Sequence, residues 1–114
     1  MKKNKKIFDV KIKKYFTYFS KKNLDELSKM FSNNVSLVDW NINVKGKKKV
    51  LDINKKIFKN KKILVKHEES FYNFAKNVVS CKIKVIINNK KLNVIDLIYF
   101  DKNMKIKKIM AYLR

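Results

Sequence analysis

The chain has 114 residues, of which 46% are hydrophobic, so it is long enough for one domain with a buried core and too short for two ordinary domains. Thirty Lys and Arg residues against nine Asp and Glu residues give a formal net charge of +21. All the basic residues except Arg114 are lysine. We expect a single domain that spans residues 1–114.

The positive charge belongs to the whole sequence rather than to one segment. It includes Lys82 and Lys84 within an apolar run and Lys90 and Lys91 beside a turn. Proteins that bind phosphate groups commonly use arginine, whose guanidinium group can donate two hydrogen bonds to one phosphate. An excess of Lys, Asn and Ile with a single arginine is instead typical of proteins encoded by AT-rich genomes. The pattern favours composition bias, and we do not expect sequence-specific nucleic-acid binding.

Cysteine usage and the N-terminus bear on the compartment. Cys81 is the only cysteine, so the chain can form no internal disulfide, and a reducing environment is expected. The N-terminal MKKNKK resembles the start of a signal peptide, but Asp9 and Lys11 interrupt any apolar segment after it. No apolar run approaches the length of a membrane span. We expect a soluble, cytoplasmic protein without a membrane segment.

Two helices are predicted in the first third of the chain. From Ile7 to Phe19, apolar residues recur at helical spacing and place Tyr15 on the inward stripe. A second helix begins at Asn23, with Glu26 in capping-box spacing, and is expected to end at Asn33 and Asn34. Its buried side comprises Leu24, Leu27, Met30 and Phe31.

A strand and a third helix follow. Val35 to Trp40 alternates as a strand and puts Asp39 on the same face as Val35 and Leu37. Gly46 is the position where a positive φ is expected, and the apolar spacing from Val50 to Phe58 then predicts a helix.

The second half of the chain reads as strands. The expected segments are 63–67, 71–74, 78–87, 92–100 and 105–113. Asn88 and Asn89 suit a tight hairpin because Asn tolerates left-handed geometry, and Asp101 to Met104 forms the next turn. Helices followed by antiparallel strands indicate an α+β fold, with the helices packed on one face of a curved sheet.

Asp96 is the least expected residue in these strands. Alternation from Leu92 to Phe100 places it on the same face as Val94 and Ile98. An unpaired ionised carboxylate there would cost several kcal/mol, so the group must be neutral, hydrogen-bonded or facing a polar cavity. Desolvation should push it toward the protonated, hydrogen-bond-donating form.

Three segments carry a resemblance to a known family: YFTYFSKKNLDEL in the first two helices, VSLVD before Gly46, and VIDLIYFDKNMKI near the end. With these the chain resembles the SnoaL-like branch of the nuclear transport factor 2-like superfamily, and within it is similar to ketosteroid isomerases. The resemblance implies a cone-shaped, strongly curved, mostly antiparallel sheet that wraps around N-terminal helices and encloses a pocket.

The resemblance also implies roles for three residues. Tyr15 corresponds to an oxyanion-hole tyrosine, Asp39 to a general base, and Asp96 to a protonated aspartate. It implies a small apolar ligand and no cofactor. We also expect a homodimer, because Val38, Ile95, Leu97 and Tyr99 leave an apolar face on the back of the sheet that the few helices cannot cover. The expected pocket wall comprises Phe19, Trp40, Phe58, Ile98, Phe100, Ile109 and Ala111. Trp40 stands where the isomerases often carry proline, so a polyketide-cyclase type of enzyme with one acid/base aspartate remains an alternative.

Other interpretations stay open. Tyr15 can be a core tyrosine, Asp39 can cap the turn after its strand, and Asp96 can hold helix to sheet through a hydrogen bond to Tyr15. His67 lacks a His or Cys neighbour, so no metal site is expected. The alternative functions are a noncatalytic dimeric ligand-binding or scaffold module, and a binder of nucleic acid or anionic surfaces.

Overall fold

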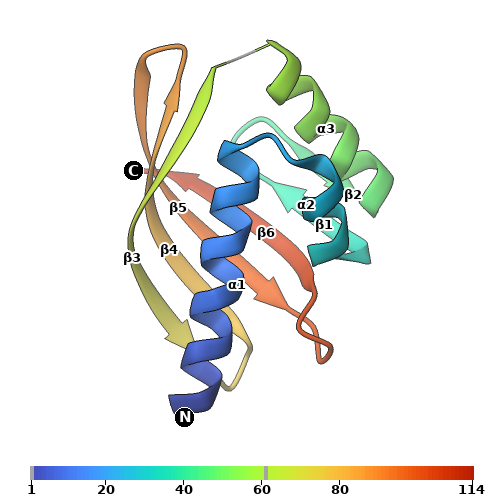
Figure 1. Ribbon diagram of the computed structural model, residues 1–114, viewed down its shortest axis with the longest axis vertical. Helices are drawn as coiled ribbons and strands as arrows, with labels where there is room; N and C mark the ends of the chain where they lie inside the picture. The colour runs from blue at the N-terminus through green and yellow to red at the C-terminus, as the bar shows by residue number, and fades with distance from the viewer. Residues whose placement is uncertain (1, 61) are drawn as a thin grey trace.

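The computed structural model describes residues 2–60 and 62–114, in which three helices lie against one face of a six-stranded sheet (Figure 1). Met1 and Lys61, which belong to the expected single domain, lie outside the described residues. The helices are α1 (Lys2–Ser20), α2 (Leu24–Met30) and α3 (Lys47–Asn60). The strands are β1 (Phe31–Val38), β2 (Asn43–Lys45), β3 (Ile63–Asn73), β4 (Val78–Ile87), β5 (Lys90–Phe100) and β6 (Ile106–Leu113). The expected α+β class is confirmed.

The sheet is strongly curved and is mostly antiparallel. Its strand order is β2-β1-β6-β5-β4-β3, and the β1–β6 pair is parallel. The pairing register shifts between Phe31 and Ser36, between His67 and Glu69, and between Tyr99 and Phe100. Because a bulge bends a strand and increases its twist, these shifts help the sheet to wrap around α1. The helices cover its concave face (Figure 1).

The turns follow the local chemistry that the sequence indicated. Asn88 and Asn89 have φ values of 50° and 72°, which is the left-handed pair that a tight hairpin between β4 and β5 requires. Gly46 has a φ of 105°, directly before α3. Met104, in the turn after β5, has a φ of 61°.

The boundary between α2 and β1 corrects one expectation. The helix ends at Met30 instead of continuing to Asn33, and Phe31 is already extended, with φ −89° and ψ 141°. Phe31 pairs with Ile106 of β6, a residue far along the chain. Strand formation depends on such pairing partners, which the local helical spacing does not reveal. Phe31 is buried as expected, but on a strand.

Two other elements are longer than expected. Helix α1 begins at Lys2 instead of Ile7. The two short segments expected after α3 are one strand, β3, because the polar run between them contains the bulge between His67 and Glu69. The bulge disrupts the alternation without ending the strand.

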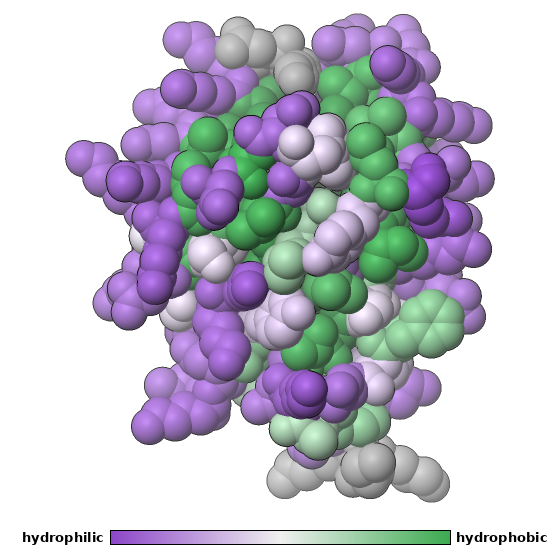
Figure 2. Space-filling model, turned by 180° about the vertical axis from the view of Figure 1, so that it is seen from behind, coloured by the Kyte–Doolittle hydropathy of each residue, from purple (hydrophilic) through white to green (hydrophobic). Residues whose placement is uncertain are grey.

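The outer face of the sheet carries apolar side chains that no helix covers. These include Val38, Leu64, Phe71, Ile95, Leu97, Tyr99 and Tyr112. Figure 2 shows this side of the molecule, with hydrophobic residues through the middle and hydrophilic residues around them. No helix in the part of the chain that the structure describes is long and apolar enough to cross a membrane.

Candidate functional site

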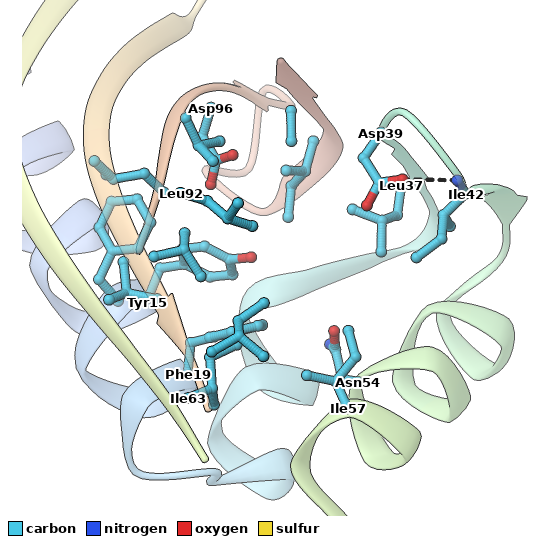
Figure 3. A pocket seen from close by; sticks show the side chains of 18 of the residues that line it. Tyr15, Phe19, Leu37, Asp39, Ile42, Asn54, Ile57, Ile63, Leu92 and Asp96 are labelled. Carbon is cyan, nitrogen blue, oxygen red and sulfur yellow. Dashed lines mark hydrogen bonds between the residues drawn. The ribbon is translucent and has the colours of Figure 1, made fainter. Parts of the chain in front are cut away.

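A pocket of about 130 Å³ lies between the concave face of the sheet and the helices α1 and α3 (Figure 3). Its wall is mostly aliphatic and aromatic, with four polar side chains from separate parts of the chain. The polar residues are Tyr15, Asp39, Asn54 and Asp96. An apolar pocket with a few converging polar groups is the usual form of a small-molecule site.

Tyr15 comes from the inward stripe of α1. Its side chain is 6% exposed, and its ring contacts those of Phe16, Phe19 and Phe31. The hydroxyl points into the pocket (Figure 3). Burial, and next the negative charge of Asp96, raise the pKa of the Tyr15 hydroxyl well above its ordinary value. Tyr15 therefore keeps its proton and can donate a hydrogen bond.

Asp96 lies on β5 where the pocket meets the core. It is 7% exposed and pairs across the sheet with Cys81 on β4 and Ala111 on β6. Burial, and next the charge of Asp39, raise the pKa of Asp96 from 3.8 to about 7. The carboxyl is therefore protonated in a large fraction of molecules at neutral pH and can act as a donor.

Tyr15 and Asp96 are not bonded to each other. Among the described residues no hydrogen bond joins the two side chains, and neither is bonded to a third group. The interpretation of Asp96 as a hydrogen-bonded link from sheet to α1 is therefore wrong. Both polar groups are available to a molecule in the pocket.

Asp39 follows the last residue of β1, and its side chain caps the turn that comes after it. Its Oδ1 accepts hydrogen bonds from the backbone N–H groups of Asn41 and Ile42, both at 2.7 Å. This is the turn cap expected of an aspartate at a strand end. The other carboxylate oxygen turns toward the pocket, opposite Asp96 (Figure 3). Capping the turn thus leaves one oxygen of Asp39 available in the pocket.

Asn54 is a pocket residue that the sequence interpretation missed. It projects from α3, is 3% exposed, and its Nδ2 has no hydrogen-bond partner among the described residues. The signal was present in the sequence, because Asn54 lies four residues after Val50 and four before Phe58 on the buried stripe. A polar residue inside an apolar helical stripe is as informative as Asp96 inside its strand.

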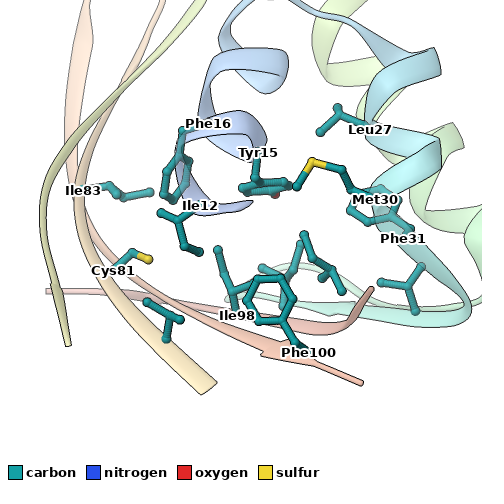
Figure 4. Packing of buried hydrophobic residues seen from close by; sticks show 14 of the residues in the cluster. Ile12, Tyr15, Phe16, Leu27, Met30, Phe31, Cys81, Ile83, Ile98 and Phe100 are labelled. Atoms are coloured by element: carbon teal, nitrogen blue, oxygen red, sulfur yellow. The ribbon is translucent and has the colours of Figure 1, made fainter. Parts of the chain in front are cut away.

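Four of the seven residues expected in the pocket wall lie there, and three lie elsewhere. Phe19, Trp40, Ile109 and Ala111 line the pocket. Phe58, Ile98 and Phe100 instead belong to the buried core (Figure 4 shows the last two). Alternation along β5 predicts which face of the sheet carries Ile98 and Phe100, but not whether these side chains reach the pocket. On that face of β5 only Leu92, Val94 and Asp96 line the pocket.

His67 is the only histidine of the sequence and was considered above as a metal ligand. Within residues 2–60 and 62–114, no group of three His, Cys, Asp or Glu side chains could hold a metal ion. The Nε2 of His67 lies 2.6 Å from Ser70 Oγ, and its ring stacks on Phe16. Burial lowers the pKa of His67.

Comparison with known proteins identifies the fold. Neither a protein-family model nor a curated protein matches the sequence. The solved structure of a nuclear transport factor 2-like protein of unknown function from Cytophaga hutchinsonii matches with a TM-score of 0.79 and 14% identity, over 91% of this chain and 87% of that one. A putative polyketide cyclase from Sinorhizobium meliloti matches with a TM-score of 0.81 and 16% identity, over 89% and 92%.

A steroid delta-isomerase from Pseudomonas aeruginosa also matches, with a TM-score of 0.75 and 13% identity, over 93% of this chain and 78% of that one. The chain therefore has the nuclear transport factor 2-like fold, also described as cystatin-like, and the resemblance seen in the sequence is confirmed at the level of the fold. Because one fold hosts many functions, the site has to carry any argument about activity.

Proposed function

We propose that this protein binds a small, largely apolar carbonyl compound in the pocket and moves a proton on it, without a cofactor. The observation that carries the proposal is the convergence of Tyr15, Asp39 and Asp96 on one apolar pocket. They come from α1, the end of β1, and β5, which are far apart in the sequence. The reaction would be of the isomerase or polyketide-cyclase type, the kinds named for two of the similar structures.

The proposed chemistry divides the three residues into donors and a base. The hydroxyl of Tyr15 and the protonated carboxyl of Asp96 donate hydrogen bonds to the carbonyl oxygen, where negative charge develops. The free oxygen of Asp39 takes a proton from the adjacent carbon, which leaves an enolate. In a substrate with a carbon–carbon double bond next to that carbon, the enolate is a dienolate, and Asp39 returns the proton to its far (γ) carbon. The carbon–carbon double bond then moves into conjugation with the carbonyl, and Asp39 is ionised again as at the start.

One observation favours the noncatalytic alternative, a ligand-binding or scaffold module. Asp39 Oδ1 is occupied by two backbone hydrogen bonds, so the residue has a structural role whether or not it moves a proton. In this alternative Tyr15 and Asp96 still bind the carbonyl oxygen, and no bond changes.

Exchange of hydrogen for deuterium separates these functions. Cyclohexanone in D2O loses its protons beside the carbonyl, and proton NMR measures the rate. Deuterium enters the ketone when the proton held by Asp39 exchanges with D2O before a proton is returned to carbon. Catalysis therefore predicts that the wild-type protein accelerates this exchange and that the Asp39→Asn variant does not, although the Asn side chain can still cap the turn. Binding without acceleration would support the module. Absence of both binding and acceleration would contradict both functions.

We also propose that the protein is a homodimer and acts in the cytoplasm. The apolar outer face of the sheet, which includes Ile95, Leu97 and Tyr99, is the surface we propose for pairing. A reducing compartment suits a chain whose single cysteine, Cys81, is buried.

A further inference from the structure

Asn54 is a polar side chain whose position the proposed chemistry does not explain. It is 3% exposed, its Nδ2 has no hydrogen-bond partner in the described part of the chain, and it lies in the pocket wall. A buried donor without a partner carries its full desolvation penalty, so stability alone would favour an apolar residue of similar size. Leucine would continue the stripe between Val50 and Phe58.

The position of Asn54 relative to the other polar groups is informative. It projects from α3, whereas Tyr15 and Asp96 come from α1 and β5 across the pocket (Figure 3). No side-chain hydrogen bond joins Asn54 to Asp39 or to any other described residue. The rest of the pocket wall is mostly apolar, with Leu37 and Ile57 among its residues. Asn54 is therefore separate from the carbonyl-binding pair.

We infer that Asn54 is a specificity-determining residue that binds a second oxygen of the ligand. This inference rests on the proposed carbonyl site and extends it. The ligand class is then a compound with two oxygen functions, a ketone or aldehyde that carries a hydroxyl or second carbonyl group. A hydroxyl or carbonyl oxygen accepts from the Asn54 amide, while the first carbonyl accepts from Tyr15 and Asp96.

The size of the pocket limits the same ligand. Its volume of about 130 Å³ is close to the ~150 Å³ of an apolar cavity that accepts benzene. One ring of six atoms, or an open chain of similar size, therefore fills the enclosed part. Larger ligands would have to extend past the rim, where Trp40 is 44% exposed.

Matched ketones test the inference, and the protein has its own reporter. Trp40 is the only tryptophan and lies on the pocket wall, so its fluorescence should report binding. The compounds are 3- and 4-hydroxycyclohexanone. Each is compared with the methylcyclohexanone that carries a methyl group at the ring position of the hydroxyl. At least one hydroxy ketone should bind roughly 10-fold more tightly than its methyl partner, the scale expected when one buried hydrogen bond is satisfied.

The variant Asn54→Leu keeps the approximate size of the side chain and removes the amide. In this variant the ratio of the affinity for the hydroxy ketone to that for the methyl ketone should fall to about 1 or below. Binding of the methyl ketone itself should be retained. Its melting temperature should be equal to or above that of the wild type, because an unpartnered buried amide is gone. Asn4→Leu, the same change at an exposed position of α1, should leave the preference unchanged.

The outcomes separate this inference from the function on which it rests. Equal binding of each matched pair by the wild type, or a preference that survives in Asn54→Leu, overturns the inference and leaves the carbonyl site standing. A lowered melting temperature in Asn54→Leu also overturns it, since Asn54 would then be structural. If no ketone binds, the proposed function fails and this inference fails with it.

Discussion

Asp39 and Asp96 face the same pocket, and the charge of Asp39 adds to burial in raising the pKa of Asp96 to about 7. Burial is the larger cause, since Asp96 is only 7% exposed. Only the protonated form of Asp96 can donate a hydrogen bond to a carbonyl oxygen. The hydrogen-bonding character of the pocket therefore changes with pH near neutrality.

The first prediction is a pH-dependent effect of Asp96 on stability. Because its pKa is higher in the folded protein, its contribution to stability is complete below about pH 4 and is lost as the pH rises to about 7. A pKa difference of about 3 corresponds to roughly 4 kcal/mol. Relative to the wild type, Asp96→Asn should therefore gain unfolding free energy between pH 4 and 7 and level off above it.

Urea denaturation of both proteins at several pH values measures this gain. Comparing the two proteins cancels the titration of those carboxylates that do not interact with Asp96. A difference in unfolding free energy that stays constant from pH 4 to 8 would show that Asp96 has an ordinary pKa in the folded protein.

Asp96 and the hairpin turn show what the sequence could predict. Asp96 was expected to be buried from alternation alone, and Asn88 and Asn89 were expected to have left-handed geometry from their residue type. In each case a property of the residue or its immediate neighbours decides the outcome. Most of the fold follows in the same way, from apolar spacing and turn residues.

Phe31 and Phe100 show why the rest could not be predicted. Phe31 fits the helical spacing of α2, but parallel pairing with Ile106 makes it a strand residue. Phe100 shares a strand face with Asp96, yet it packs against Phe8 with ring centroids 5.3 Å apart, away from the pocket. Which distant strand a residue pairs with, and whether its side chain lies in the core or in the pocket, depend on three-dimensional packing. The periodicity of the sequence does not contain this information.

The second prediction concerns assembly. If the outer face of the sheet forms a homodimer, Leu97→Lys should place two charges in the interface and yield monomers. Light scattering after gel filtration measures the mass. Ile7→Lys introduces the same side chain on α1, on the other side of the sheet, and should remain dimeric. A wild-type monomer at micromolar concentration would contradict the proposed dimer.

The third prediction concerns the charge of +21. If the lysines spread over the surface bind DNA or RNA only by non-specific attraction and counterion release, the affinity should fall steeply with salt and show no sequence preference. Fluorescence anisotropy with two duplexes of equal length and different sequence, titrated at several salt concentrations, measures both properties. Sequence-selective binding that persists at physiological salt would favour a nucleic-acid function over the carbonyl site.

The last prediction distinguishes the two aspartates by their effects on proton exchange. Asp39→Asn removes the proposed base and should slow the exchange of cyclohexanone protons by about 10²- to 10⁴-fold. Asp96→Asn keeps a donor toward the carbonyl oxygen, so its rate should fall by only about 10-fold or less. The wild-type rate should also decline above about pH 7 as Asp96 ionises, and this decline should be absent in Asp96→Asn.

The same assay can reverse the assignment. If Asp39→Asn retains the exchange rate and Asp96→Asn abolishes it, then Asp96 is the group that moves the proton. Asp39 would in that case act only through the turn that it caps, with its hydrogen bonds to Asn41 and Ile42. That result would favour a cyclase type of reaction, which uses a single aspartate as acid and base. Asp96 would be that aspartate, and Asp39 would take no part in proton transfer.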